Sequence, residues 1–87
     1  MKSELLSLMN VGKAVLEDLM ILGIINIKQL AQQDPDEMYK RLCKITGKRH
    51  DPCMWDVFAA IIHEAKTGEK TPWWNWTKIR KSRNEKN

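Results

Sequence analysis

Proline and glycine residues divide this chain of 87 residues into segments of helical length. Proline suits the first turn of a helix, where its missing amide N–H has no intrahelical partner to lose. Glycine typically ends a helix because it adopts a left-handed backbone without steric cost. Glycines stand at positions 23, 47 and 68, and each proline follows a residue that can cap a helix, in the pairs Asp34-Pro35, Asp51-Pro52 and Thr71-Pro72. Several helices with defined starts and ends are therefore predicted.

The apolar residues between these breaks recur at intervals of three or four, which is the spacing of a helix with one buried face. This spacing extends over residues 13–22, 35–46 and 52–67, with a short helix expected at 26–32 and a last one from Pro72. Alternation of apolar and polar residues is nowhere long enough to indicate a strand. We predict an all-α fold, a compact bundle of about five short helices with a small core.

The turn near the N-terminus, Met9-Asn10-Val11-Gly12, is the feature on which the functional prediction depends. Apolar residues flank it at helical spacing, so two helices joined by a tight turn are expected. Gly12 is best suited to a left-handed backbone, and Asn10 is the next most tolerant. A helix that begins after Gly12 leaves its first amides without intrahelical partners, and its N-terminus attracts anions. The sequence therefore predicts a phosphate site made by Asn10, Val11, Gly12, Lys13 and Ala14.

The pattern Leu8-x-Asn10-Val11-Gly12, followed by Leu16 and Leu19, resembles a helix-hairpin-helix motif. This module usually holds a nucleic-acid phosphate on its hairpin amides. The usual form has proline in place of Met9, glycine in place of Asn10 and alanine in place of Leu16. The resemblance implies a SAM-like helical bundle that contacts nucleic acid. The alternative is a plain helical hairpin that packs and binds nothing.

Further matching segments cover most of residues 5–77. They are Glu17-Asp18-Leu19, Leu22-Gly23-Ile24, Asp34-Pro35, Leu42-Cys43, Gly47-x-Arg49-His50-Asp51-Pro52-Cys53, Asp56-Val57-Phe58, and Pro72-Trp73-Trp74 with Thr77. Together they resemble the small bacterial pathogenicity-locus family of helix-hairpin-helix proteins. This resemblance implies a compact helical domain with DNA association, and it supplies no established reaction.

Positive charge is concentrated at the C-terminus. The net charge is +4, and residues 1–77 are neutral because they carry ten basic and ten acidic side chains. We therefore predict that residues 1–77 form the helix-hairpin-helix domain and that residues 78–87 form a basic, disordered tail. A basic tail favours an acidic partner such as nucleic acid.

The connection between the helices predicted at 35–46 and 52–67 is a second candidate site. Its Lys48 and Arg49, with the free amides after Asp51, are suited to another phosphate. The Asp51 carboxylate, however, would cap those amides itself and repel an anion. A structural turn that carries basic side chains is the alternative.

The residue types of a zinc site are present in Cys43, His50, Cys53 and His63. Cys53 and His63 are separated by a rise of about 15 Å on one predicted helix, so they cannot bind the same ion. No metal site and no cofactor are expected. Cys53 is a candidate reactive thiol, because a helix start near His50 and Arg49 lowers a thiol pKa. A small residue packed against the turn is the alternative.

Trp73, Trp74 and Trp76 come shortly before the basic residues of the tail. Aromatic side chains beside basic ones can stack on unpaired bases. They can also close a small core, which is the prediction for Trp73 and Trp74, with Trp74 buried against the helix that starts at Pro52. The role of Trp76 stays open.

These features favour a non-enzymatic domain that binds the DNA backbone weakly and without sequence preference. The turn around Gly12 and Lys13 would make the main contact, with electrostatic support from Lys48, Arg49 and the tail. The alternatives are a helical protein-interaction module with a structural turn and, more distantly, a thiol-based redox or regulatory protein centred on Cys53. No catalytic residue is assigned and the oligomeric state stays open. We expect no secretory signal, no membrane span and a cytoplasmic location with free thiols.

Overall fold

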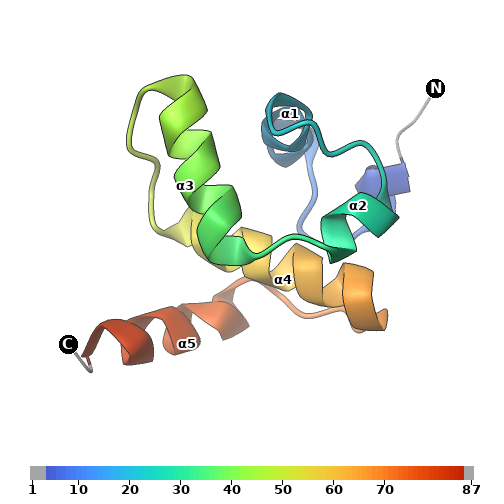
Figure 1. The fold of residues 1–87 in the computed structure, drawn as a ribbon. Helices are drawn as coiled ribbons and strands as arrows, with labels where there is room; N and C mark the ends of the chain where they lie inside the picture. Colours follow the sequence, from blue (N-terminus) through green and yellow to red (C-terminus); the bar gives the residue numbers. More distant parts are fainter. Residues whose placement is uncertain (1–3, 86–87) are drawn as a thin grey trace.

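The computed structural model describes residues 4–85, with side chains up to Ser82, and is shown in Figure 1. None of the helices in this part of the chain has the length and apolar character needed to cross a membrane. The described residues contain no strand, so the all-α prediction is confirmed. A short 3-10 helix, η1 (Glu4–Ser7), precedes five α-helices: α1 (Lys13–Ile21), α2 (Ile27–Ala31), α3 (Pro35–Thr46), α4 (Cys53–Thr67) and α5 (Trp74–Glu85).

Helix starts and ends lie close to where the sequence predicts them. At the start of α3, the Asp34 carboxylate accepts the backbone amide of Glu37 at 3.2 Å. Helices α3 and α4 end at Gly47 and Gly68, whose backbones are left-handed with φ angles of 70° and 79°. Such contacts join residues close together in the chain, which is why sequence pattern alone indicates them.

Helix α4 is the centre of the molecule and packs against α2, α3 and α5 (Figure 1). Helix α1 packs against η1 and α3. Burial of the apolar faces that meet around α4 is the main source of stability in a domain of this size. The buried apolar residues are Leu5, Leu8, Val11, Leu19, Leu22, Ile24, Leu30, Met38, Leu42, Phe58, Ile61 and Ile62.

The N-terminal turn differs from the prediction in its backbone. The segment before it is the 3-10 helix η1 instead of an α-helix. Asn10 has the left-handed backbone, with φ 74°, whereas Gly12 is extended, with φ −104° and ψ −170°. Asn10 takes this conformation because its side chain is held from both sides: Nδ2 donates to the carbonyl of Thr71 at 2.8 Å, and Oδ1 accepts the amide of Trp73 at 3.3 Å. The expectation that Gly12 supplies the left-handed residue is therefore wrong.

A buried carboxylate fixes the same turn from α4. Glu64 is 7% exposed, and its Oε1 accepts the backbone amide of Met9 at 2.9 Å. Its Oε2 lies 3.1 Å from Nζ of Lys70. The turn is thus positioned by the end of α4 and by the segment that leads from α4 to α5, both far away in the sequence.

Helix α5 continues to Glu85, so residues 78–85 of the expected disordered tail are helical, and residues 86–87 lie outside the described part of the chain. The physical reason is an anchor on α4. Arg80 Nε donates to Oδ1 of Asp56 at 2.8 Å, and Thr77 Oγ1 donates to Oδ2 at 2.7 Å. Figure 1 shows the first part of α5 below the start of α4, with the rest of α5 extending away to the lower left.

The prediction that Trp74 is buried is wrong, because 58% of the residue is exposed. Trp73 and Trp76 are half-buried and face the rest of the molecule. The Trp76 indole donates to Oγ1 of Thr71 at 3.0 Å, and its ring centroid lies 5.3 Å from that of His63. Consecutive helical residues are turned by about 100°, so Trp73 and Trp74 cannot both face α4.

Candidate functional site

The start of α1 is open to solvent. Gly12, at the N-cap position, has no side chain to accept a hydrogen bond, and Gly12, Lys13 and Ala14 are all exposed. The carbonyl of Gly12 accepts the first helical bond, from the Leu16 amide at 2.9 Å. The amides of the first helical turn therefore have no partner within the helix. This turn carries no acidic side chain, and Lys13 adds a positive charge to that of the helix end.

The starts of α2, α3 and α4 are different. At α2 and α3, the side chains of Asn26 and Asp34 accept amides of the first turn. At α4, Oδ1 of Asp51 accepts the amide of Cys53 at 2.9 Å. These side chains take up donors that an anion would need, so α1 offers the more suitable of these helix starts for a phosphate.

Two of the predicted phosphate-binding residues have structural side chains. Val11 is 8% exposed and belongs to the core. Both polar atoms of the Asn10 side chain are bonded to the α4–α5 connection. Asn10 therefore positions the turn, and the exposed surface of the predicted site consists of Gly12, Lys13 and Ala14.

The connection between α3 and α4 exposes the side chains of Lys48 and Arg49. Next to them, Nε2 of His50 lies 2.9 Å from Oγ1 of Thr46, and the His50 carbonyl accepts the hydroxyl of Tyr39. These bonds hold the segment as an ordered turn. Because Asp51 also caps the start of α4, the arrangement matches the structural turn with basic side chains, and a phosphate would have to be held by the side chains alone.

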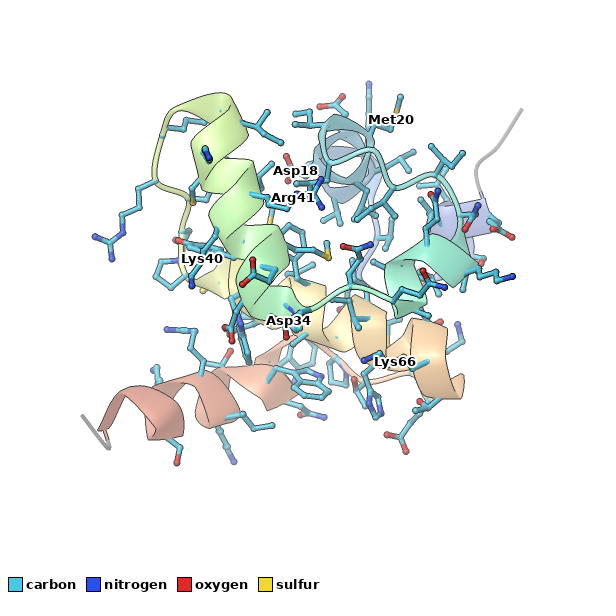
Figure 2. The ribbon with its side chains drawn as sticks, in the orientation of Figure 1. Asp18, Met20, Asp34, Lys40, Arg41 and Lys66 are labelled. Atoms are coloured by element: carbon cyan, nitrogen blue, oxygen red, sulfur yellow. The ribbon has the colours of Figure 1, made fainter. Side chains whose placement is uncertain are left out.

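Asp18 connects the two candidate regions. Burial raises the pKa of its carboxyl, and the positive charges of His50 and Lys48 oppose this rise. Figure 2 shows Asp18 on the side of α1 that faces α3, the helix that Lys48 and His50 follow in the chain.

The predicted lowering of the Cys53 pKa is wrong in direction. A hydrogen bond with the Asp51 side chain, burial, and the charges of Asp51 and Asp56 raise the pKa of the thiol. The helix start is present as expected, but a carboxylate occupies it in place of a cation. Both cysteines are free thiols, since Cys43 is also unpaired.

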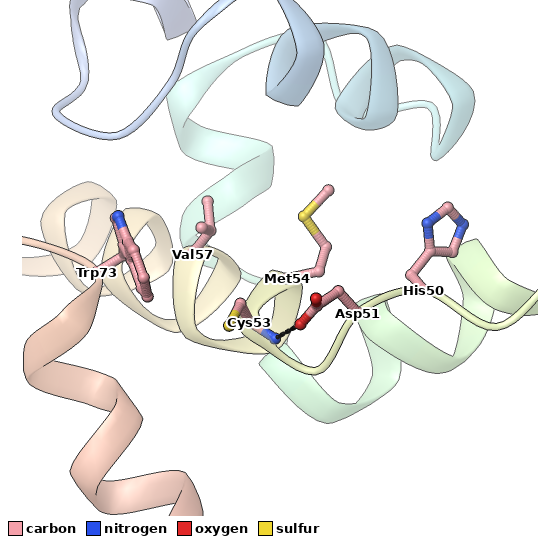
Figure 3. A pocket seen from close by; sticks show the side chains of 6 residues that line it. All are labelled: His50, Asp51, Cys53, Met54, Val57 and Trp73. Atoms are coloured by element: carbon pink, nitrogen blue, oxygen red, sulfur yellow. Dashed lines mark hydrogen bonds between the residues drawn. The ribbon is translucent and has the colours of Figure 1, made fainter.

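An open cavity with a volume of about 340 Å³ lies next to Cys53, and Figure 3 shows the side chains that line it. It is lined by His50, Asp51, Cys53, Met54, Val57 and Trp73. The described residues contain no group of three or more side chains that could hold a metal ion. The cavity walls are mainly apolar, and the polar groups at its edge are already hydrogen-bonded in the turn.

Sequence reasoning missed the anchor formed by Asp56, Thr77 and Arg80. Asp56 is fully buried and accepts hydrogen bonds from both partners. A signal was present, because Asp56 interrupts the wide apolar arc of the helix predicted at 52–67. An acidic residue in such an arc requires a partner, since an unpaired buried charge is very costly.

The fold and these contacts define a small all-helical domain with one central helix, whose buried carboxylates hold the N-terminal turn and the last helix. The chain belongs to the pathogenicity locus family, Cdd1, whose model matches residues 2–82. This finding confirms the resemblance to the pathogenicity-locus family, whereas the helix-hairpin-helix motif stays a prediction. The chain is also 38% identical over 79 residues to the mitomycin resistance protein McrB of Streptomyces lavendulae, an alignment that covers 91% of this chain and 75% of that protein. No solved structure matches the chain.

Proposed function

We propose that this protein is a non-enzymatic, cytoplasmic domain that binds the DNA backbone weakly and without sequence preference. The turn before α1 would act as the hairpin of a helix-hairpin-helix motif, and the amides at the start of α1 would hold a phosphate. The observation that carries the proposal is the exposed, uncapped first turn of α1, with Lys13 beside it. Phosphate oxygens accept hydrogen bonds from such amides and gain from the positive end of the helix.

Exposed basic side chains on other segments support the proposal, because they add to the attraction for a polyanion. Lys48 and Arg49 are exposed on the α3–α4 connection, and Lys78 and Lys81 are exposed on α5. The side chain of Asn10 joins the turn to the segment just before α5. Glu17 and Asp18 follow the turn and reduce the attraction for phosphate, which is consistent with weak binding.

A titration of labelled duplex DNA at two salt concentrations tests the proposal. Two to four phosphate contacts predict a slope of log K against log salt of about −2 to −4. Lys13→Ala should weaken binding equally for different DNA sequences, because phosphate contacts carry no base information. Lys28→Ala is the matched control, since it removes an exposed charge from α2 instead. Failure of the wild-type protein to bind DNA at low salt would refute the proposal.

The alternative function is a protein-interaction module, and exposed apolar side chains favour it. Met20 and Ile21 at the end of α1 are 64% and 47% exposed, and Ile25 after it is 67% exposed. Figure 2 shows Met20 pointing away from the other helices. If wild type and Lys13→Ala both fail to bind DNA, protein interaction replaces DNA binding as the proposed function. Met20→Ser and Ile25→Ser should then abolish association with the partner without unfolding the domain.

The name of the relative suggests a cellular test of either function. That protein is named for mitomycin resistance, and we propose that this chain contributes to the same phenotype. Expression of the chain in a mitomycin-sensitive bacterium should raise survival in the drug. If backbone binding is the cause, the Lys13→Ala variant should give less protection than Lys28→Ala.

A further inference from the structure

Helix α5 has two faces with different environments. Trp73, Trp76, Thr77 and Arg80 are half-buried at or near the contact with α4. The opposite face is exposed and includes a row formed by Trp74, Lys78 and Lys81. These three residues are spaced by four and three positions, so their side chains follow one line along the helix with steps of about 6 and 4.5 Å. We call this line the outer row of α5.

The outer row is strongly basic. Residues 70–84 contain no aspartate or glutamate. The charge of Arg80 is neutralised by Asp56, whereas neither Lys78 nor Lys81 forms an ion pair within the described residues. The unpaired positive charge of this face therefore comes from Lys78 and Lys81 of the outer row. A ligand with several negative charges is electrostatically complementary to such a row.

The aromatic member of the row is held in place. The ring of Trp74 packs edge-to-face against that of Trp73, with centroids 5.8 Å apart and planes at 81°. Trp73 is itself fixed, since its amide donates to the Asn10 side chain. With 58% of the residue exposed, Trp74 presents indole surface to solvent in a defined orientation. Such a ring is a platform on which any nucleobase can stack.

We infer that the outer row of α5 binds unpaired nucleotides of single-stranded DNA. A base stacks on Trp74, and the phosphates that follow contact Lys78 and Lys81. This inference rests on the proposed DNA binding and assigns it a preferred form of DNA. Asn10 joins the turn before α1 to Trp73, so the proposed phosphate site and the outer row are attached to each other through this contact.

The distribution of apolar residues argues against a membrane surface as the ligand. A helix that lies in a membrane interface has a continuous apolar face. The large exposed apolar residues of α5 are Trp74 and Ile79, which is 45% exposed. They are separated by about 140° around the helix, so they form no such face.

Fluorescence anisotropy of the full chain with labelled oligothymidylate of about 16 nucleotides tests the inference, with a duplex of the same length as the second probe. Trp74→Ala should weaken binding to the single strand about 5- to 100-fold, because a stacked base is lost. Its effect on the duplex should be less than about twofold, and Trp74→Phe should retain most of the single-strand affinity. Ile79→Ala, on the other edge of the exposed face, is the matched control and should leave both affinities unchanged.

The lysines should respond differently. Lys78→Gln and Lys81→Gln should weaken binding to both probes, and each should reduce the magnitude of the salt slope by about 1. Thermal unfolding of each variant serves as the folding check, and exposed positions should leave the melting temperature unchanged.

Three results would overturn the inference, and they are distinguishable. If the duplex binds and Trp74→Ala binds the single strand as tightly as wild type, the inference fails while the proposed function stands. If the wild-type protein binds neither probe at low salt, both fail. If it binds vesicles of phosphatidylserine and phosphatidylcholine in a Trp74-dependent way but no oligonucleotide, the outer row is a membrane-binding surface.

Discussion

The guanidinium of Arg80 and the carboxylate of Asp56 join α5 to the central helix. Arg80 donates through Nε at 2.8 Å and through Nη2 at 3.3 Å, and Thr77 donates a third hydrogen bond at 2.7 Å. Asp56 is fully buried, and none of its oxygens lacks a partner. A two-point contact with a planar carboxylate suits arginine better than lysine.

Arg80→Ala should therefore destabilise the fold. The substitution leaves a buried carboxylate without its cation, and breaking such a pair costs about 3 kcal/mol. Arg80→Lys should restore part of the loss, since it keeps the charge but not the fork geometry. Lys81→Ala, at an exposed neighbouring position, is the control and should change stability by less than about 0.5 kcal/mol. Urea unfolding measures the differences, and equal midpoints for Arg80→Ala and Lys81→Ala would contradict this role.

Two substitutions at Asn10 should separate its backbone role from its side-chain role. Asn10→Gly tolerates the left-handed backbone but loses two hydrogen bonds to the α4–α5 connection, a cost of about 2 kcal/mol. Asn10→Ala loses the same bonds and adds about 1 kcal/mol of backbone strain. Unfolding free energies should thus fall in the order wild type, glycine, alanine. If Asn10→Gly had a higher free energy of unfolding than the wild-type protein, the two hydrogen bonds of the Asn10 side chain would contribute nothing to stability.

Gly12 allows a test in which folding and phosphate binding change in opposite directions. Its backbone is extended and, apart from its chain neighbours, no heavy atom lies within 4 Å of the position of an added Cβ, so a side chain fits without strain. Gly12→Asn should cap α1 and raise stability by about 0.3 kcal/mol. The same side chain occupies the amides that would hold a phosphate, so DNA binding should weaken. Gly12→Ala, which fits but cannot cap, is the control. Undiminished binding by Gly12→Asn would place the phosphate elsewhere.

The Cys53 thiol should react slowly at neutral pH. The pKa of this thiol is raised, chiefly by the hydrogen bond with Asp51, and only the thiolate is alkylated. In a Cys43→Ser background, the rate of alkylation should therefore reach its plateau at a higher pH than for an unperturbed cysteine. Asp51→Asn should shift the profile to lower pH, because the negative charge is removed while a capping side chain is kept. A Cys53 that reacts faster than a free thiol at neutral pH would contradict the structure.

Local chemistry was enough to predict α1 to α4 and the approximate start of α5, but not the 3-10 form of η1 or the continuation of α5 beyond residue 77. Asp34 caps α3 through the Glu37 amide, and Gly47 and Gly68 end helices with left-handed backbones, all through contacts among near neighbours in the chain. The exposed start of α1 at Gly12 and Lys13 was predictable for the same reason, because the lack of a capping side chain is visible in the sequence. The exposure of the charged side chains of Lys48 and Arg49 was also predictable from the sequence.

The tertiary structure decided the features that depend on residues far apart in the chain. Asn10 takes the left-handed position because Thr71 and Trp73, more than 60 residues away, hold its side chain. Trp74 is exposed because Arg80 and Thr77 are anchored to Asp56 and so fix which face of α5 meets α4. Helix capping and apolar spacing act over one or two turns and can be read from the order of residues. The burial of a side chain, the backbone conformation of Asn10 and the orientation of α5 depend on residues that packing brings together from distant parts of the chain. A short stretch of sequence does not contain both partners of such a contact.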